Sequence, residues 1–540
     1  MIDNLDQAFT RALDDARAQF RARNPQSAAA FASAAAHLPG GSTRSVLYYE
    51  PFPLTVARGE GSQVWDIDGH RYVDFVGEFS AGLYGHSDPI IRAAIIEALS
   101  GGVVLAAPTL LEQRLAAAIS ARFASIDRLR FCNSGTEANL LALVTAMAHT
   151  GRKKILAFRE GYHGGVLSFS GGGNPMNVPF DVVLATYNDP DSVRDAFLRH
   201  GGELAAVIVE PILGAGGNIP GTLEFLQTLR SETARAGTVL VFDEVKTSRT
   251  GAGGVQGLRG IRPDLTTLGK YLGGGLPSGA FGGDRQIMDR FDPKAAKPLK
   301  HAGTFNNNVC SMAAGLAGLT QVFTVDRANA FLADCEKLRQ GLNERMAARD
   351  LPIQFVGLGS IFTIHFARRP IATPADIPPV SPKLAQLFHM ECMLRGVSVV
   401  ARGDIFISLP ISAADSDELV AAVEHFADRH GERERRRHLR EERVGGGPRL
   451  DDLGDPLLVE ARGEQKELKI EFDPKDLESE RMIRVDFGNG CGGASSLAWV
   501  WWGGGAALVV AGSAMGVRIL RSGGGKSSVR SKSQGKKRGN

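Results

Sequence analysis

Short apolar runs alternate with longer amphipathic segments over residues 85–320. The runs are continuously apolar, as expected for strands covered by helices on both faces, whereas a strand with one wet face alternates apolar and polar residues. This pattern predicts a mainly parallel sheet between layers of helices, which is an α/β domain. The predicted strands are RLRFCN (128–133), KKILAF (153–158), FDVVLAT (180–186), AAVIVEP (205–211), TVLVFDEV (238–245) and LTTLG (265–269).

The regions on either side of this domain have different periodicities. Residues 1–38 carry apolar side chains at helical spacing, and residues 53–75 hold two β-prone runs around a turn at Asp68 and Gly69. After residue 320 the clearest strands are GLGSIFTIHF and DIFISLP. We therefore predict four segments: N-terminal helices and strands (1–84), a large domain (85–320), a smaller α+β domain (321–430) and a low-complexity tail (431–540).

The tail differs in composition from the rest of the chain. A run of charged residues is followed by residues 491–517, which hold no charge and three of the chain's four tryptophans. We favour a disordered extension or a mispredicted gene end. A membrane-spanning helix has the required length but is weakened by several glycines, and a small accessory domain is the third alternative.

Composition and charge exclude several functional classes. The 43% of apolar and 22% of charged residues are typical of a soluble globular protein. Residues 1–430 hold 41 Lys and Arg against 43 Asp and Glu, so this body has no electrostatic reason to bind nucleic acid. The five cysteines have no metal-ligand spacing, and the N-terminus has no apolar signal-peptide core. We therefore predict a cytoplasmic protein without a bound metal.

Two carboxylates, Asp243 and Glu244, follow the apolar run TVLVF without a break. Ligands of α/β sheets bind beyond the carboxyl ends of the strands, and Asp243 lies at such an end. A helix cap or a turn is the alternative role for this aspartate.

Another predicted strand ends in Ser134, Gly135 and Thr136 and then opens a helix. Backbone N–H groups at a helix start, together with small hydroxyl side chains, suit a phosphate group. Taken alone, this tripeptide is a weak signal.

Lys270 follows a third predicted strand and precedes Gly273, Gly274 and Gly275. A lysine in a glycine-lined pocket loses charge by desolvation and becomes a nucleophile for a carbonyl, whereas a solvated surface lysine is the alternative. A phosphate cradle, an acid and a reactive lysine together indicate pyridoxal 5′-phosphate. The lysine would form a Schiff base with its aldehyde, and the acid would keep the pyridine nitrogen protonated.

With these residues identified, residues 35–430 resemble the class III aminotransferases of pyridoxal-phosphate (PLP) fold type I. The motifs that carry the resemblance are NSGTEAN, GYHG, VEP, FDEV, TTLGKYLGGG and GTFNNN. The resemblance implies a large PLP-binding domain with a mostly parallel seven-stranded sheet and a smaller α+β domain, and it assigns residues 1–84 to the small-domain and dimer-arm region. Within the class, the sequence looks most like the group of glutamate-1-semialdehyde aminomutase and β-phenylalanine aminotransferases.

The resemblance also implies roles for the residues around the cofactor ring. Lys270 would hold the cofactor and then move protons on the substrate carbon. Asp243 would pair with the ring nitrogen, while Tyr162 and Val245 would cover the two ring faces. A half-buried aromatic and a core valine are the alternatives for these two, and we expect His163 to be structural.

Further residues would bind the polar groups of the cofactor. Ser134, Gly135 and Thr136 would form the phosphate site, and Glu210 would lie near the phenolic oxygen. Thr304 resembles a threonine that reaches the phosphate of a neighbouring subunit. The resemblance therefore implies a homodimer with shared active sites.

The substrate must be inferred from other residues. Arg44 lies in a Gly/Ser loop, where a guanidinium can hold a carboxylate through two hydrogen bonds. Arg402 matches a second arginine of the β-amino-acid enzymes, thought to bind the second carboxylate of 2-oxoglutarate, or is a surface-strand arginine. We predict an aminotransferase that passes the amino group of a β-amino acid to a 2-oxo acid in a ping-pong reaction, with the side-chain pocket near Tyr48 or Phe52.

Two other functions remain open on the sequence. Glutamate-1-semialdehyde 2,1-aminomutase would move the amine within one molecule, and Arg44 suits its substrate too. The segments RSVLYYEPFPL and GTFNNNVCSMAAG favour the β-amino-acid enzymes. A non-catalytic scaffold relative would have lost cofactor residues, yet all the expected ones are present.

Overall fold

The structure, a computed structural model, describes residues 2–445 and, beyond them, the strand segments 467–469, 481–486, 497–503, 506–511, 517–518 and 528–531. The chain divides into two compact units, Met1–Glu442 and Arg443–Asn540. All of the predicted site residues belong to the first unit.

The first unit contains a seven-stranded sheet in which every strand except β12 runs in the same direction. Each strand predicted for the large domain is present, which confirms the α/β class. In spatial order the strands are β4 (Arg128–Cys132), β12 (Gly279–Gly283), β11 (Leu265–Gly269), β10 (Val239–Asp243), β7 (Leu204–Val209), β5 (Lys154–Phe158) and β6 (Val182–Ala185).

The antiparallel strand β12 was not predicted, because its sequence GAFGG is rich in residues that disfavour strands. Close backbone approach explains these glycines. A Cβ atom on Gly279 would lie 2.3 Å from the carbonyl oxygen of Ser134, and one on Gly283 would lie 2.0 Å from that of Asp264. The glycines therefore allow β12 to fit between its neighbours.

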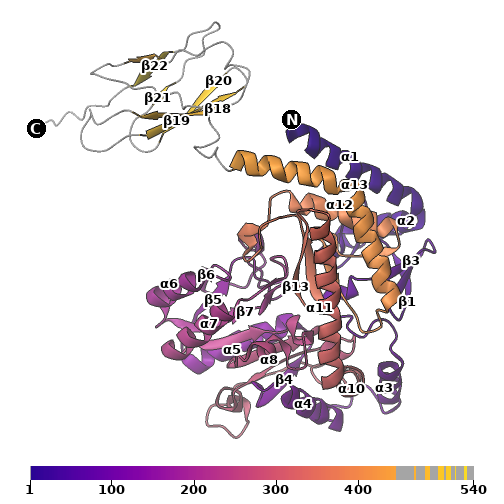
Figure 1. Cartoon of the computed structure of the whole chain (residues 1–540). Helices are drawn as coiled ribbons and strands as arrows, with labels where there is room; N and C mark the ends of the chain where they lie inside the picture. Colours follow the sequence, from indigo (N-terminus) through magenta and orange to yellow (C-terminus); the bar gives the residue numbers. More distant parts are fainter. Residues whose placement is uncertain are drawn as a thin grey trace, which may run out of the picture. The chain divides into compact units, whose positions relative to one another are not determined.

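Helices cover both faces of this sheet (Figure 1). Alternate strand residues point to opposite faces, so β10 sends Leu240 and Phe242 to one core and Val239 and Val241 to the other. The first core is closed by α6 (Pro190–His200) and α7 (Leu223–Ala236), and the second by α5 (Gly135–Thr150). Burial of each large apolar side chain contributes about 1.5–3 kcal/mol.

The remaining helices of the large domain pack at the β4 side of the sheet or follow its loops. Helix α10 contacts both α3 and α4. The helices are α3 (Pro89–Ser100), α4 (Leu110–Arg122), α8 (Gly254–Arg259), α9 (Arg285–Met288) and α10 (Val309–Ala317).

The N-terminal segment shares one hydrophobic core with the C-terminal part of the same unit. Phe9 and Phe20 of α1 pack in the same cluster as Phe388 of α12. The elements of this region are α1 (Ile2–Arg23), α2 (Pro25–Ala34), β1 (Val56–Glu60), β2 (Gln63–Asp66), β3 (Arg71–Asp74), α11 (Val325–Ala348), β13 (Gln354–Leu358), β14 (Ile361–His365), α12 (Ser381–Leu394), β15 (Val397–Ser398), β16 (Asp404–Phe406) and α13 (Ala413–Gly445).

Two small sheets organise this region. The predicted hairpin is confirmed: β2 and β3 are antiparallel, and Gly69 takes a φ of +91° in the turn between them. The order of the first sheet is β1-β2-β3-β15, and that of the second is β13-β14-β16. The second sheet carries Asp404, which bears on the candidate site.

In the second unit, the described segments are β17 (Glu467–Lys469), β18 (Arg481–Asp486), β19 (Leu497–Gly503), β20 (Ala506–Ala511), β21 (Val517–Arg518) and β22 (Ser528–Ser531). Strand β19 pairs antiparallel with both β18 and β20. The rest of the predicted tail and of its apolar stretch 491–517 lies outside the described residues. Among the described helices, none alone has the length and apolar character to cross a bilayer, whereas Val309–Val322 with Val325–Ala348, bent by 73°, passes that test as a pair.

Candidate active site

The sequence-predicted residues follow strand ends that meet at one edge of the seven-stranded sheet. The carboxyl ends of parallel strands share an edge, and the two antiparallel steps through β12 give β4 the same direction as β11. Asp243 of β10 is the register partner of Thr267 of β11, and Lys270 follows three residues later. The residues that follow these strands are Ser134, Gly135 and Thr136 (β4), Tyr162 and His163 (β5), Glu210 (β7), Asp243 (β10) and Lys270 (β11).

The carboxylate of Asp243 is buried and held by several donors. Asn139 Nδ2 donates to its Oδ2 over 2.8 Å, and His163 Nδ1 lies 2.8 Å from the same oxygen. The backbone N–H of Val245 donates to Oδ1 over 3.1 Å. Because these groups fix both oxygens, the carboxylate has a defined orientation at the strand end.

Glu244 points away from this edge. It is fully buried, and its carboxylate accepts hydrogen bonds from Thr247 Oγ1 over 2.5 Å and from the N–H groups of Val255 and Gln256 over 3.2 and 2.8 Å. Burial raises the pKa of Glu244 above its ordinary value, and these donors oppose that shift. The second carboxylate after β10 therefore holds the loop that leads to α8.

Lys270 begins a short 3-10 helix, Lys270–Gly273, directly after β11. Its φ of +55° lies in the left-handed region, which costs a residue with a side chain about 1–2 kcal/mol. Desolvation lowers the pKa of Lys270, whereas the charges of Asp243 and Glu210 raise it. No hydrogen bond to Lys270 Nζ is formed within the described part of the chain. The amine is thus partly desolvated and lies within electrostatic reach of two carboxylates.

The predicted phosphate site lies at the first turn of α5. Ser134 is the N-cap, and its Oγ accepts from the N–H of Glu137 over 3.1 Å. The N–H groups of Gly135 and Thr136 have no partner within a helix at these positions. A Cβ on Gly135 would lie 2.5 Å from Val245 Cγ1, so glycine is required where the helix approaches this valine.

Tyr162 and Glu210 are linked through the backbone. The N–H of Tyr162 donates to Glu210 Oε1 over 2.9 Å, and the N–H of Gly214 donates to Oε2 over 3.0 Å. The Tyr162 side chain is 45% exposed, which suits a ring that covers a ligand. Desolvation raises the pKa of Tyr162, while the charges of Arg44 and Arg402 lower it, so both arginines lie within electrostatic reach of this residue.

Thr304 is exposed, in the loop that precedes α10. The loop is tied to the predicted phosphate site, because Asn133 Nδ2 donates to Asn306 Oδ1 over 2.9 Å. Asn133 directly precedes Ser134. Among residues 2–445, no side-chain hydrogen bond joins Thr304 to the residues at the strand ends, and its role toward a neighbouring subunit stays a prediction.

Arg44 is held against a left-handed turn. Its guanidinium pairs with Glu78 and lies over the ring of Phe79, 5.3 Å from the centroid. Four consecutive residues, Gly77 to Ser80, have φ between +47° and +78°, with Glu78 at +47° and Phe79 at +54°. This strained turn places both partners of Arg44 on one side, and such strain is characteristic of functional sites.

The two aromatic residues predicted near the substrate pocket differ in burial. Tyr48 is exposed and donates its hydroxyl to Glu50 Oε1 over 2.7 Å. Phe52 lies in the hydrophobic core, with its ring centroid 5.6 Å from that of Phe20. Phe52 therefore cannot line the pocket.

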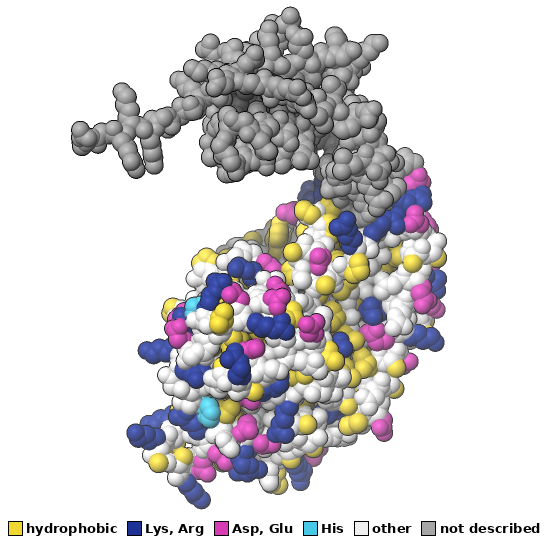
Figure 2. Space-filling view, turned by 60° about the vertical axis from the view of Figure 1, so that its left-hand side comes forward, with side chains coloured by type: hydrophobic (Ala, Val, Ile, Leu, Met, Phe, Trp, Pro, Cys, Tyr) yellow, Lys and Arg dark blue, Asp and Glu magenta, His cyan; other side chains and the backbone are white. Residues whose placement is uncertain are grey.

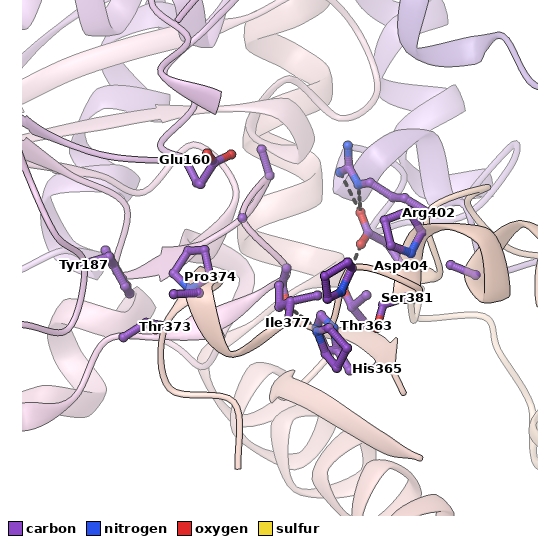
Figure 3. A pocket seen from close by; sticks show the side chains of 18 of the residues that line it. Glu160, Tyr187, Thr363, His365, Thr373, Pro374, Ile377, Ser381, Arg402 and Asp404 are labelled. Carbon is purple, nitrogen blue, oxygen red and sulfur yellow. Dashed lines mark hydrogen bonds and ion pairs between the residues drawn. The ribbon is translucent and has the colours of Figure 1, made fainter. Parts of the chain in front are cut away.

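A cavity of about 550 Å³ lies beside Arg402 (Figure 3). Figure 3 shows the Arg402 guanidinium against the Asp404 carboxylate at one end of the cavity, with Glu160 and Tyr187 on the other side. Arg402 Nε donates to Asp404 Oδ2 over 2.6 Å. The lining of this cavity does not include Lys270 or Asp243, but it includes Tyr187, whose hydroxyl donates to the carbonyl oxygen of Glu210 over 2.9 Å.

These residues fit pyridoxal 5′-phosphate. A helix N-terminus offers N–H donors for a phosphate, a buried carboxylate is available for a ring nitrogen, and a desolvated lysine is available for an aldehyde. Sequence reasoning missed the supports of Asp243, since Asn139 lies four residues into α5 and His163 was expected to be structural. The sequence signal was their presence inside the motifs NSGTEAN and GYHG.

Comparisons with known proteins agree with the α/β fold. The family described as aminotransferase class-III matches residues 47–426. The chain is 49% identical over 424 residues to β-phenylalanine transaminase of Variovorax paradoxus, covering 78% of this chain and 98% of that protein. The crystal structure of a β-phenylalanine aminotransferase from Variovorax paradoxus superposes with a TM-score of 0.77, at 49% identity and with the same coverage. A glutamate-1-semialdehyde 2,1-aminomutase of Thermus thermophilus is 38% identical over 392 residues, covering 69% of this chain and 92% of that protein.

Proposed function

The chain belongs to the class III aminotransferases, and we propose that it transfers the amino group of a β-amino acid to a 2-oxo acid. The enzyme is a pyridoxal phosphate-dependent transaminase. The observation that carries the choice of substrate is the 49% identity over nearly the whole length of a β-phenylalanine transaminase. The aminomutase relatives are less similar, at 38% identity for the one described above.

The chemistry that the cofactor supplies when bound is an aldehyde that accepts the amino group and a ring that withdraws electrons from the carbon carrying it. Lys270 would hold the cofactor covalently and would then, as a free amine, take the proton from the substrate carbon that carries the amino group and deliver it to the cofactor. Asp243, fixed by His163 and Asn139, would hold a proton on the ring nitrogen. Tyr162 and Val245 would bind the two ring faces, and Glu210 would orient Tyr162 through its N–H.

Arg44 and Arg402 would recognise carboxylates in the two halves of the reaction. Arg44 is exposed enough to exchange Glu78 for a substrate, and its charge reaches both Tyr162 and Lys270. Arg402 lies in the wall of the cavity, and its side chain is 42% exposed. A dicarboxylic acceptor such as 2-oxoglutarate would engage Arg402, whereas pyruvate would not.

The active site would be completed by a second copy of the chain in a cytoplasmic homodimer. Thr304 is exposed next to the predicted phosphate site, and large apolar side chains are exposed at Val104, Leu110 and Phe305. Figure 2 shows one face on which hydrophobic side chains gather between charged ones. Sedimentation analysis should give twice the mass of the chain; a monomer with full activity would contradict the shared site.

A panel of amino donors and acceptors tests the proposed reaction. Racemic β-phenylalanine with 2-oxoglutarate should give glutamate and the β-keto acid, and single-turnover mixing with β-phenylalanine alone should convert bound pyridoxal phosphate to pyridoxamine phosphate. Turnover of glutamate-1-semialdehyde without an added acceptor, and none of β-amino acids, would instead establish an aminomutase.

A further inference from the structure

Asp404 accepts hydrogen bonds from two directions. Arg402 Nε donates to its Oδ2 over 2.6 Å from the cavity side. Thr363 Oγ1 donates to its Oδ1 over 2.7 Å from the neighbouring strand β14. Asp404 is only 1% exposed, so its charge depends on these neighbours rather than on water.

From Thr363, a series of side-chain hydrogen bonds leads to a buried lysine, Lys246. Asn218 Nδ2 donates to Thr363 Oγ1 over 2.7 Å, and Lys246 Nζ donates in turn to Asn218 Oδ1. Every donor in this series points toward Asp404. The carboxylate therefore lies between two basic side chains, with Arg402 in direct contact and Lys246 at the far end of two side chains.

The surroundings of Lys246 keep its amine in place. Its Nζ lies 4.9 Å from the ring centroid of Phe406, and a Cβ on Gly214 would lie 3.0 Å from it. Lys246 belongs to the segment FDEVKTSR that also provides Asp243 and Val245. None of the roles assigned above uses this lysine, although it is buried close to the site.

Release of Arg402 would leave Asp404 as a buried carboxylate without its ion-pair partner, which is strongly unfavourable unless another cation compensates. We propose that Lys246 is a positioning residue that becomes the counter-charge of Asp404 when Arg402 turns to the second carboxylate of a dicarboxylic 2-oxo acid. This inference deepens the proposed function and rests on the role given there to Arg402.

The electrostatics of Lys246 support this exchange. Desolvation lowers the pKa of Lys246 to about 7; Asp404 and Glu210 raise it, and Arg402 and Lys270 lower it further. When Arg402 moves away from Asp404, the positive charge of Arg402 no longer lowers the pKa of Lys246, while the carboxylate of Asp404 still raises it. The pKa of Lys246 then rises, and above pH 7 the amine takes a proton from the buffer.

Linkage fixes the direction of the pH dependence. Because the ligand-bound state holds the extra proton, affinity for a dicarboxylate should be constant below about pH 7 and fall by up to about tenfold per pH unit above it. A monocarboxylate leaves Arg402 on Asp404, so its affinity should lack this dependence.

His365 is the other titratable side chain that faces Asp404 within this group. Burial lowers the pKa of His365, and its Nε2 lies 2.9 Å from the carbonyl oxygen of Gly217 in the cavity wall. A proton taken up near Asp404 could therefore be assigned to either residue. The variant His365→Gln, which retains a donor for Gly217, distinguishes them.

Calorimetry on the holoenzyme tests the inference with two unreactive ligands, glutarate and butyrate. Titrations at pH 8 in two buffers of different ionisation enthalpy give the number of protons taken up, and the absorbance of the bound cofactor reports any protonation there. We expect uptake of about 0.5–0.9 proton with glutarate and none with butyrate. The glutarate uptake should persist in His365→Gln and disappear in Lys246→Met.

A second variant, Lys246→Arg, keeps the experiment informative if Lys246→Met does not fold. Lys246→Arg keeps a permanent charge, so glutarate should bind without proton uptake. Uptake equal to wild type in either Lys246 variant would overturn the inference. If glutarate binds wild type and Arg402→Gln equally, the role of Arg402 itself fails. If Arg402→Gln loses its preference for glutarate over butyrate, but Lys246→Met takes up as many protons as wild type, the role of Lys246 is refuted and that of Arg402 stands.

Discussion

The imidazole Nδ1 of His163 lies 2.8 Å from the carboxylate Oδ2 of Asp243, although His163 follows strand β5 and Asp243 ends strand β10, and β7 separates these two strands. With the carboxylate ionised, the Nδ1–H donates to it. The other ring nitrogen, Nε2, is buried and has no hydrogen-bond partner among the described residues. The contact fixes the acid across the edge of the sheet where Lys270 also lies.

Replacing Asp243 with Asn should leave the protein folded and able to bind the cofactor, but slow its turnover on the order of 10²–10³-fold, as for the loss of one electrostatic contact to a reacting system. The amide retains the shape of the carboxylate and cannot hold a proton on the ring nitrogen. Stopped-flow measurement of the first half-reaction gives the rate.

Glu244→Gln is the matched control, since this neighbouring carboxylate points to α8 instead. It should retain the rate of the first half-reaction. Near-wild-type rates in Asp243→Asn would contradict the pairing with the ring.

Glu244 should matter for stability rather than for catalysis. Glu244→Ala removes the acceptor of three buried donors and should lower the free energy of unfolding by about 1–3 kcal/mol. Burial raises the pKa of Glu244, so the stability linked to its proton is present at low pH and is lost as pH rises through that pKa. The side chain in Glu244→Gln cannot ionise, so the free energy of unfolding of this variant should decline less as pH rises. Equal denaturant midpoints for wild type and Glu244→Ala would refute this role.

Arg44→Ala should raise the KM for a carboxylate-bearing amino donor by about 10–100-fold, the expected effect of losing charge-assisted hydrogen bonds. The guanidinium is partly exposed, so the melting temperature should change little. A simple amine without a carboxylate is the control substrate, and its kinetics should not respond to the change. Parallel losses for both substrates would indicate that Arg44 holds the left-handed turn instead of the substrate.

The placement of the site could be predicted from the sequence because it follows from periodicity. Continuous apolar runs identify buried strands, and the polar residue after each run lies at the shared carboxyl edge. Asp243 and Lys270 were found in this way, with Ser134 at the start of α5. Their motifs then indicated the cofactor.

The remaining features depend on contacts between residues far apart in the chain. Lys246 is separated from Asp404 by two side chains that belong to different strands and loops, and no local pattern brings them together. The left-handed turn at Glu78 and Phe79 breaks the local preference of these residues, so propensity argues against it. Strand β12 is hidden by its glycines. Such features can be identified only in the folded structure.

The central claim is that Lys270, and not the nearby buried Lys246, holds the cofactor. Borohydride reduction of the holoenzyme, followed by proteolysis and mass spectrometry, tests it directly. The added mass of the reduced cofactor should lie on the peptide that contains Lys270 and should vanish in Lys270→Ala. The same mass on the Lys246 peptide, or no modified lysine in an active preparation, would contradict the account.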